Sequence, residues 1–307
     1  MIVTVTPNPS IDRTVTVEHL RLGEVNRASS SRVDPGGKGV NVSRALAANG
    51  IKTLAVLPLG GEGGRELGAL LREAGLEHIA VPIQGNTRTN TAIVDASGRT
   101  TKVNEPGPRL SGADVRGLTS AIPPDAPWVV LCGSLPGGTD GSPLHEIVTT
   151  HPGRVAVDTS GPSLAAAVEA RPYLIKPNRE ELEELVGSPL TTVGQVRAAC
   201  RELVDGGITL VVASLGADGA LVTSEEGQWA ASARVTTPRS TVGAGDCLMA
   251  GVISGLSEHL HPHLALARGV AWGSAAVSLP GSQVPGPADI ARVAVTTTSP
   301  DDSWILT

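Results

Sequence analysis

Aromatic side chains are scarce in this chain of 307 residues. It has no Phe, one Tyr and four Trp, and aromatics make up 2% of the sequence, against 40% for all hydrophobic residues. A core of this composition must be built from Val, Leu, Ile and Ala. The 37 Gly and 23 Pro indicate many turns, not disorder, because apolar runs recur along the whole chain.

Positive charge is also in short supply. Lys and Arg number 24 against 30 Asp and Glu, which gives a formal net charge of −6. This balance excludes a general binder of nucleic acid or of an anionic membrane. An anionic small molecule would therefore need a local basic pocket.

Cysteine is rare, and long apolar segments are missing. Cys132, Cys200 and Cys247 are odd in number and far apart, which favours a reducing compartment without a disulfide framework. The first residues, MIVTVTPNPS, lack the basic and apolar regions of a signal peptide. The longest apolar runs fall well short of the ~20 residues that span a bilayer. We expect a cytoplasmic protein.

Short β-branched runs alternate with helical patterns along the chain. The expected strands cover residues 2–6, 53–59, 128–132, 154–158 and 209–214. The expected helices between them cover residues 39–49, 64–74, 142–149, 163–169, 178–186 and 194–205. Strands that are apolar on both faces and alternate with helices predict an α/β fold, with a mostly parallel sheet between helical layers. We expect one domain spanning residues 1–307.

Two polar regions break this alternation. Residues 11–33 alternate polar and apolar side chains around a Gly turn, and residues 87–104 read as a hairpin around DASG. Both are too polar for core strands, so we expect a small β lid that stands off the main domain. From residue 246 onward the pattern is helical, over 246–258, 263–278 and 286–296, and we expect a loose tail after residue 297.

One acid directly follows a glycine turn in the stretch STVGAGD. The strand-like residues 234–237 precede this turn, and an apolar helical pattern follows it. The backbone N–H groups of Gly243, Ala244 and Gly245 would then lie free at a helix N-terminus, where negative charge is favoured. Asp246 beside them could deprotonate an attacking hydroxyl. The same pattern also fits an ordinary glycine turn with an acid that stabilises the helix start.

A second glycine-rich turn is PGGKGVN, which contains Gly37, Lys38 and Asn41. It is not a phosphate-binding P-loop, because Lys38 is followed by Gly and not by Ser or Thr, and it lacks the spacing of a dinucleotide fingerprint. The glycines with Lys38 and Asn41 suit a polar ligand that lies against the backbone. A tight turn into a helix explains them equally well.

Two further motifs follow predicted strands. In IKPNREEL, Lys176 is followed by Asn178 and Glu181, which share one face if helical and could hold a hydrated Mg²⁺ through water. The alternative is an ordinary acidic helix start. In SLGADGA, the positions Ser214, Gly216 and Gly219 could line a nucleotide pocket or merely form a hairpin.

Three other stretches contain residues that could contribute to a site. GSLPGG (133–138) and DTSG (158–161) follow strands and are candidates for the wall of a cleft, because ligands bind at the carboxyl ends of parallel strands. HLHPH brings His259, His261 and His263 together, but Pro262 disrupts any helical spacing. A surface turn is the favoured interpretation of the histidines.

Taken together, the order Asp12, PGGKGVN, GSLPGG, KPNREEL, SLGADGA and STVGAGD resembles the ribokinase/PfkB family of sugar kinases over essentially the whole chain. The resemblance implies a ribokinase-like three-layer α/β/α fold with a β lid over the sugar site. It also implies an ATP:sugar phosphotransferase, in which the Gly-Ala-Gly amides form an anion hole and Asp246 is the catalytic base. The Asn178–Glu181 pair would be the element that binds Mg²⁺ and phosphate.

Within this family, TPNPSIDRTV, LGEVNRA and TTKVNEPGP are most similar to the 1-phosphofructokinases, and next to the tagatose-6-phosphate kinases. The match implies that Asp12, Gly37, Lys38 and Asn41 bind sugar hydroxyls. It also implies that two lid arginines, Arg27 and Arg88, hold the phosphate already present on the substrate, which supplies the local positive charge. After TRTN the chain has Thr91 and Ala92 where many 1-phosphofructokinases carry Val-Lys, so one expected basic group near the phosphate is missing.

The expected reaction is phosphorylation of fructose 1-phosphate at O6 by ATP with Mg²⁺, and the resemblance leaves open a K⁺ ion near the anion hole. The expected nucleotide-binding residues are Lys176, Asn178, Ser214, Gly216 and Gly219, with the purine near residues 270–282. Apolar lid strands often pair between subunits, so the expected assembly is a homodimer. The alternatives are a kinase for tagatose 6-phosphate or fructose 6-phosphate, and a non-catalytic sensor of sugar phosphates.

Overall fold

The main sheet has ten strands in the order β14-β13-β12-β11-β10-β9-β8-β1-β4-β5. In the computed structural model, which describes residues 1–137, 139 and 142–306, the seven strands from β5 to β11 in this order are parallel, and β12, β13 and β14 continue the sheet antiparallel. The strands are β1 (Ile2–Val5), β4 (Thr53–Leu59), β5 (His78–Pro82), β8 (Trp128–Cys132), β9 (Arg154–Asp158), β10 (Leu174–Ile175), β11 (Leu210–Ser214), β12 (Ala220–Ser224), β13 (Gly227–Ala233) and β14 (Val295–Thr298).

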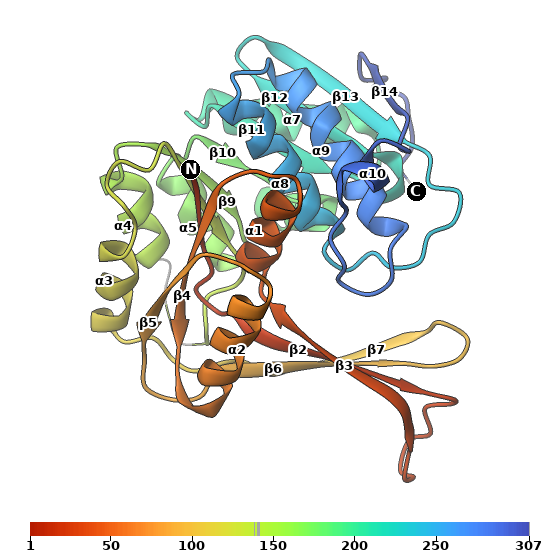
Figure 1. Cartoon of the computed structure of the whole chain (residues 1–307). Helices are drawn as coiled ribbons and strands as arrows, with labels where there is room; N and C mark the ends of the chain where they lie inside the picture. The colour runs from red at the N-terminus through yellow and green to blue at the C-terminus, as the bar shows by residue number, and fades with distance from the viewer. Residues whose placement is uncertain (138, 140–141, 307) are drawn as a thin grey trace.

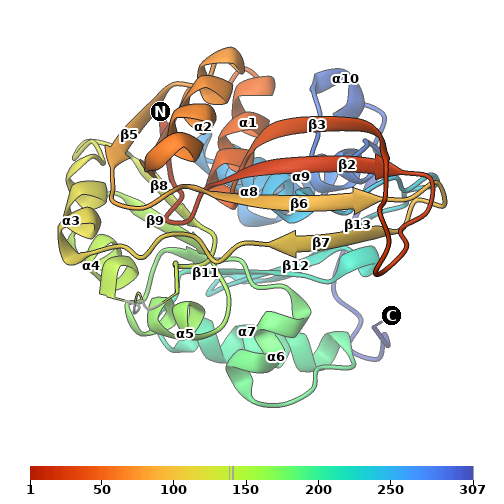
Figure 2. The ribbon, with the colours of Figure 1, turned by 90° about the horizontal axis from the view of Figure 1, so that it is seen from below.

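Helices cover both faces of this sheet (Figures 1 and 2). One layer consists of α1 (Lys38–Ala48), α2 (Gly61–Glu73), α8 (Ala244–Ser257) and α9 (Pro262–Val277), with the short α10 (Pro287–Ile290) against α9. The other consists of α3 (Gly112–Ser120), α4 (Ser142–Thr150), α5 (Pro162–Glu169), α6 (Arg179–Val186) and α7 (Val193–Asp205). Two large aliphatic clusters, one on each face, join the helices to the strands. The layers are the α/β/α arrangement that the sequence predicts.

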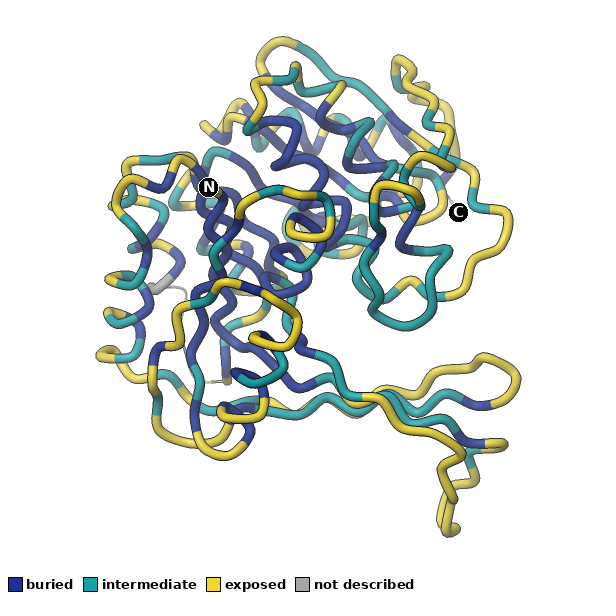
Figure 3. Tube along the Cα trace, viewed as in Figure 1, coloured by how far each residue is buried: buried dark blue, intermediate teal, exposed yellow. Residues whose placement is uncertain are grey.

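A smaller sheet projects from the main domain (Figure 1). Its order is β3-β2-β6-β7, built from β2 (Ser10–Val17), β3 (Ala28–Gly36), β6 (Arg88–Val94) and β7 (Thr100–Asn104). Most residues at its outer end are exposed, with Val17 and Asp95 buried among them, whereas the end near the main domain is partly buried (Figure 3). We call this four-stranded sheet the lid, and it corresponds to the two polar regions of the sequence.

Several elements differ from the sequence predictions. Helix α3 and strands β5 and β13 were not predicted, and β13 ends at Ala233, so residues 234–237 are not a strand. The helix predicted over 286–296 is wrong: only α10 forms, and β14 follows it and pairs with β13. The β-branched run VAVTTT favours a strand there once a sheet edge is available.

The predicted loose tail is likewise ordered in part. Ile305 bridges to Thr192, Leu306 is buried, and the indole of Trp304 donates to Asp218 at 3.3 Å. The last glycine of GSLPGG, residue 138, lies outside the described residues. Among the described residues no helix is long and apolar enough to cross a bilayer.

Candidate active site

The carboxyl ends of the central strands bring together residues that are far apart in the sequence. Asp158 ends β9, Lys176 follows β10 directly, and Ser214 ends β11. These parallel strands are neighbours in the sheet, so their ends meet at one edge. The first turn of α1 and the first turn of α8 face this same edge, as their contacts with Asp158 and with each other show.

Asp158 is the electrostatic centre of the edge. It is buried, and its Oδ1 lies 2.8 Å from the Nζ of Lys38 while its Oδ2 lies 3.2 Å from the Nζ of Lys176. Burial alone would raise the pKa of Asp158, but the charges of Lys176 and Lys38 outweigh it and lower the pKa. The Asp158 charge in turn raises the pKa of Lys38 well above its usual value. Asp158 and Lys38 therefore form an ion pair at neutral pH, and the Nζ of Lys176 lies against the second carboxylate oxygen.

Asp246 lies in the first turn of α8, which begins after Gly243 in a left-handed conformation at φ 78°. Its side chain is 6% exposed, and its Oδ2 accepts a hydrogen bond of 2.9 Å from the Nδ2 of Asn41. Burial and the neighbouring Asp158 charge raise the pKa of Asp246 to about 6, against the Asn41 hydrogen bond and the charges of Lys38 and Lys176, which lower it. A carboxyl with this pKa can both accept and return a proton near neutral pH.

The glycine turn before Asp246 forms the helix start that the sequence predicts. The helix begins at Ala244, so the N–H groups of Ala244 and Gly245 are among those without a partner inside the helix. The N–H of Ala244 makes a long bond of 3.3 Å to the carbonyl of Thr241. A Cβ atom on Gly245 would lie 3.6 Å from the Nζ of Lys176, so this amide and this ammonium group border the same space.

The base of the lid holds a second polar group. The Oδ1 of Asp12 accepts from the hydroxyl of Ser10 at 2.7 Å and from the amide of Asn90 at 3.1 Å. Gly36 lies directly beside this carboxylate, because any Cβ atom there would overlap it. Gly37 follows with φ 110° and starts α1, which explains why a glycine pair occurs at this junction.

Arg88 starts β6 beside Ser10, close to Asp12. Its guanidinium donates to the carbonyls of Glu105 and Asn8, each at 3.0 Å. Burial lowers the pKa of Arg88, opposed by the charges of Asp12 and Glu105. Arg88 is thus held at the base of the lid by neutral backbone carbonyls, and Asp12 and Glu105 are the acids that act on its charge.

Arg27 lies at the other end of the lid. Val17 pairs with Ala28, while Ser10 pairs with Arg88, so the whole length of β2 separates the two arginines within one chain. Arg27 is exposed. The structure therefore does not bring Arg27 and Arg88 together in a single chain.

Asn178 and Glu181 form a reciprocal cap at the start of α6. The Oδ1 of Asn178 accepts from the Glu181 N–H at 2.7 Å, and the Oε2 of Glu181 accepts from the Asn178 N–H at 2.9 Å. The other oxygen, Oε1 of Glu181, lies 3.9 Å from the Nζ of Lys38. The pair thus has a structural role, and one carboxylate oxygen of Glu181 still faces the site.

The SLGADGA motif is a turn beside this cap. Asn178 bridges to Ser214, and the chain then passes through the single-turn η1 (Gly216–Asp218) into β12. Gly216 and Gly219 have φ values of 60° and 97°, which other residues rarely adopt. The strand, turn and second strand occur as predicted, next to the capped start of α6.

Sequence reasoning missed the importance of Asp158. It singled out DTSG only as a candidate cleft wall, although an acid that ends a buried strand is a signal for a site. The partners that make Asp158 central come from residues 38 and 176, and no local pattern reveals them. The histidines at 259, 261 and 263 form no metal-ligating group of three in the described part of the chain; His261 lies 3.0 Å from Glu226.

Known proteins are similar to the whole chain. The family model "pfkB family carbohydrate kinase" matches residues 6–289. The 1-phosphofructokinase of Xanthomonas campestris pv. campestris is 41% identical over 83% of this chain and 84% of that protein, and the 1-phosphofructokinase of Rhodobacter capsulatus is 37% identical over 97% and 96%. The structure of phosphofructokinase-2 from Escherichia coli, solved with substrates and products, is 33% identical over 95% of this chain and 97% of that one, with a TM-score of 0.89.

These findings confirm the ribokinase-like fold expected from the motifs. The chain belongs to the pfkB family of carbohydrate kinases.

Proposed function

We propose that this kinase transfers the γ-phosphoryl group of ATP to O6 of fructose 1-phosphate, giving fructose 1,6-bisphosphate and ADP. The observation that carries the proposal is the buried Asp246, which has a pKa of about 6 and lies in the first turn of a helix whose leading amides are free of intrahelical bonds. The relatives named 1-phosphofructokinase support the choice of sugar phosphate.

Asp246 acts as the general base. Its carboxylate accepts the proton of the C6 hydroxyl as the oxygen of that hydroxyl forms a bond to the γ-phosphorus and the bond to the bridging oxygen of ADP breaks. The Asn41 amide orients the carboxylate through the oxygen that it binds and leaves the other oxygen for the hydroxyl. Because the pKa is about 6, most Asp246 is ionised at neutral pH, and the proton it gains returns to solvent after release of the product.

Backbone amides and lysines would stabilise the negative charge on the phosphoryl group during transfer. The N–H groups of Gly243, Ala244 and Gly245 would form the anion hole, and Lys176, whose ammonium borders Gly245, adds a full positive charge. Lys38 and Lys176 are held by Asp158 and not by solvent, so they are oriented before the substrates bind. Little reorganisation is then needed during transfer.

The residues around Lys38 fit a hydrated Mg²⁺ ion. Oε1 of Glu181 faces this part of the site, whereas both oxygens of the buried Asp158 contact lysines, and Mg²⁺ prefers one or two carboxylates together with water and substrate phosphates. Glu181 would hold the ion through water, whereas the side-chain oxygen of Asn178, the other expected ligand, is taken by the cap of α6. When bound, Mg²⁺ neutralises charge on the ATP phosphates. Asn178, Ser214, Gly216 and Gly219 would border the nucleotide.

The lid would bind the sugar phosphate. Asp12 would accept hydrogen bonds from sugar hydroxyls, together with Gly37, Lys38 and Asn41 in the turn that follows the lid. Arg88 would contact the existing phosphate, since its direct hydrogen-bond partners are neutral backbone carbonyls and it lies close to Asp12. The missing basic group at Thr91 and Ala92 keeps tagatose 6-phosphate and fructose 6-phosphate as competing substrates of the same site.

The far end of the lid favours a homodimer. Leu22 and Val25 are 91% and 81% exposed, and Arg27 follows them in the chain. Because Arg27 lies a strand length away from Arg88 of its own chain, it would serve the phosphate site of a second copy. The oligomeric state in solution tests this: a monomer that is fully active would remove Arg27 from the phosphate site.

The deciding experiment measures ADP release with fructose 1-phosphate, fructose 6-phosphate, tagatose 6-phosphate and fructose in turn. We expect kcat/KM to be highest for fructose 1-phosphate and to exceed that for unphosphorylated fructose by at least ~100-fold, because a site built to bind a phosphate discriminates strongly against a substrate that lacks it. Mg²⁺ should be required, and replacing Na⁺ with K⁺ tests the expected K⁺ site. A higher kcat/KM for another sugar phosphate would refute the substrate assignment. Binding without any ADP release would favour the sensor.

A further inference from the structure

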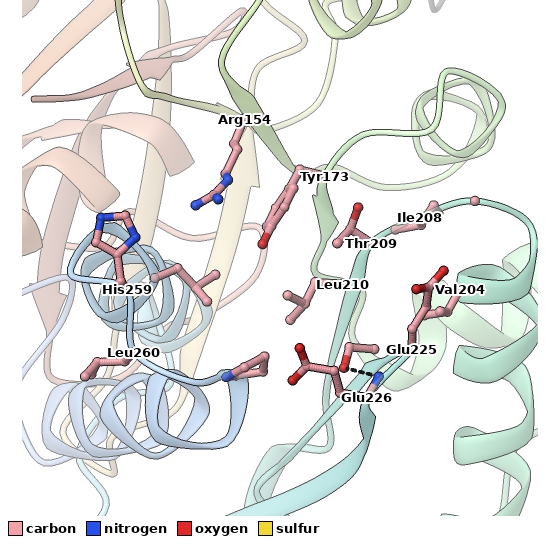
Figure 4. Close-up of a pocket in the computed structure, with 14 residues that line it drawn as sticks. Arg154, Tyr173, Val204, Ile208, Thr209, Leu210, Glu225, Glu226, His259 and Leu260 are labelled. Carbon is pink, nitrogen blue, oxygen red and sulfur yellow. Dashed lines mark hydrogen bonds between the residues drawn. The ribbon is translucent and has the colours of Figure 1, made fainter.

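Two adjoining cavities lie at the amino end of the main sheet, away from the active site. The first, of about 410 Å³, is lined by residues before β10 and β11, by the end of β12 and by the connection between α8 and α9 (Figure 4). The second, of about 470 Å³, reaches to Met1 and Lys52. Both share Arg154 and His259. Arg154 begins β9, whose last residue is Asp158, so the cavities and the active site lie at opposite ends of one strand.

Aromatic rings hold Arg154 in place. Its guanidinium lies 5.5 Å from the ring centroid of Trp128 and 4.9 Å from that of Tyr173, and the two rings meet edge to face at 5.3 Å. Tyr173 is the only tyrosine of a chain that is very poor in aromatics. In the part of the chain that the structure describes, no carboxylate lies within 4.0 Å of the Arg154 guanidinium. Its N–H groups are therefore oriented but not neutralised, which suits a planar contact with an anion.

A second basic side chain, Lys52, lines the second cavity together with Arg154. The second cavity is lined by the first residue of the chain, by Lys52 and by His259, and none of its lining residues among those described is an Asp or Glu. His259 has a φ of 63°, which turns the chain sharply after α8 and brings this side chain to both cavities. In an acidic protein the two basic side chains of this lining, Arg154 and Lys52, are a local concentration of positive charge.

The far wall of the first cavity has the opposite character. Glu225 and Glu226 lie there, and Figure 4 shows Glu226 and Arg154 projecting from opposite sides of the space. Glu226 is also 3.0 Å from His261. Carboxylates and the hydroxyls of Thr209 and Ser224 can accept hydrogen bonds from hydroxyl groups but would repel a second anionic group.

We propose that these cavities form a binding site for a small phosphorylated polyol or sugar. The phosphate would contact Arg154 at the junction, with Lys52 and His259 beside it, and the hydroxylated body would extend into the first cavity toward Glu225 and Glu226. A dianionic phosphate matches two cations, Arg154 and Lys52, better than a singly charged carboxylate does. The volume is within the range of small-molecule sites. None of these residues belongs to the catalytic cleft, so the site does not depend on the proposed function.

The site can be tested by isothermal titration calorimetry of the full chain with sorbitol 6-phosphate and with inorganic phosphate. In the Arg88→Met variant, where the proposed phosphate contact of the cleft is removed, sorbitol 6-phosphate should still bind once per chain. Adding Arg154→Met should weaken this binding at least ~10-fold, because a charge-assisted contact is lost while the methionine still covers the rings. Adding Arg292→Met instead, at an exposed arginine elsewhere, should leave it unchanged.

Loss of all binding in Arg88→Met, or equal binding with and without Arg154→Met, would overturn the proposal and assign the ligand to the cleft. Lys52→Met, which removes a charge without touching the rings, should weaken binding of inorganic phosphate ~3-fold; this second variant keeps the test valid if Arg154→Met does not fold. Sorbitol 6-phosphate should bind more tightly than inorganic phosphate, and Glu226→Gln should reduce that difference. Equal affinities of the unsubstituted chain for sorbitol 6-phosphate and inorganic phosphate would overturn the proposal that the first cavity binds the hydroxylated body of the ligand. The calorimetry requires no turnover, so its outcome is independent of the substrate of the kinase.

Discussion

Replacing Asp246 with Asn should change activity and stability in opposite directions. The substitution keeps the shape of the side chain and removes its charge and its ability to accept a proton. We expect kcat to fall by about 10²–10⁴-fold, the usual contribution of a positioned acid–base group, while KM for the sugar phosphate stays within a few-fold. The sugar contacts that set KM lie in the lid and in α1, and the substitution leaves them in place.

The expected gain in stability follows from the pKa of Asp246. Burial raises this pKa from 3.8 to about 6, and each unit corresponds to about 1.4 kcal/mol, so ionised Asp246 costs the folded state about 3 kcal/mol at neutral pH. Because the folded pKa is raised, the folded state binds more protons between pH 3.8 and 6, and its stability falls as the pH rises through this window. The neutral amide of the Asp246→Asn variant avoids this cost but is left partly unpaired, so we expect a gain of about 1–3 kcal/mol at pH 8.

The assay combines ADP release with urea unfolding of both proteins at pH 8 and pH 5. The gain in the free energy of unfolding should shrink at pH 5, where Asp246 is largely protonated in the folded protein. Asp205→Asn, at an exposed aspartate at the end of α7, is the control and should change neither quantity. Turnover close to that of the unsubstituted enzyme would refute the assignment of the base. A loss of stability at pH 8 would refute the reasoning about burial.

Three further predictions follow from the same contacts. The acid limb of the pH profile of kcat should have an apparent pKa of about 6. Asn41→Ala should raise this pKa by about 1 unit, because the carboxylate of Asp246 loses a hydrogen bond, whereas the control Asn49→Ala at the end of the same helix should not change it. An unchanged pKa in both variants would contradict the Asn41 contact. Lys176→Met should destabilise the protein by about 3–5 kcal/mol in urea unfolding, because Asp158 loses a buried partner, and a neutral effect would show that Lys38 alone suffices. Arg88→Met should raise KM for the sugar phosphate about 10–100-fold with little change in kcat, and an unchanged KM would remove Arg88 from the phosphate site.

Local patterns in the sequence predict much of the fold. The buried strands are short, β-branched and apolar on both faces, so β1, β4, β8, β9 and β11 are found within a residue or two of their expected positions. The lid is predictable because its strands alternate in polarity, as a sheet with one solvated face does. Strand β14 is not predictable in this way, because it depends on a sheet edge formed by residues about 60 positions earlier, and the tail contacts Thr192 and Asp218, which are still further away in the sequence.

The site is predictable only as far as its motifs are local. The glycine turn before Asp246 and the cap formed by Asn178 and Glu181 can both be read from neighbouring residues. The importance of Asp158 cannot be read from neighbouring residues, because Lys38 comes from the start of α1 and Lys176 from the end of β10. The separation of Arg27 from Arg88 depends on how the lid strands pair, and the spacing of the two residues in the sequence contains no information about that register.

The short junction between β3 and α1 connects movement of the lid to the position of α1. Gly37 alone separates the last residue of β3 from Lys38, the first residue of α1. A tilt of the lid would therefore displace the first turn of α1. The first turn of α1 contains Asn41, whose side-chain amide donates a hydrogen bond to the carboxylate of Asp246. A sugar phosphate that draws the lid inward would therefore change the pKa of Asp246 before ATP binds. Binding of the sugar phosphate would in this way prepare the site for phosphoryl transfer from ATP.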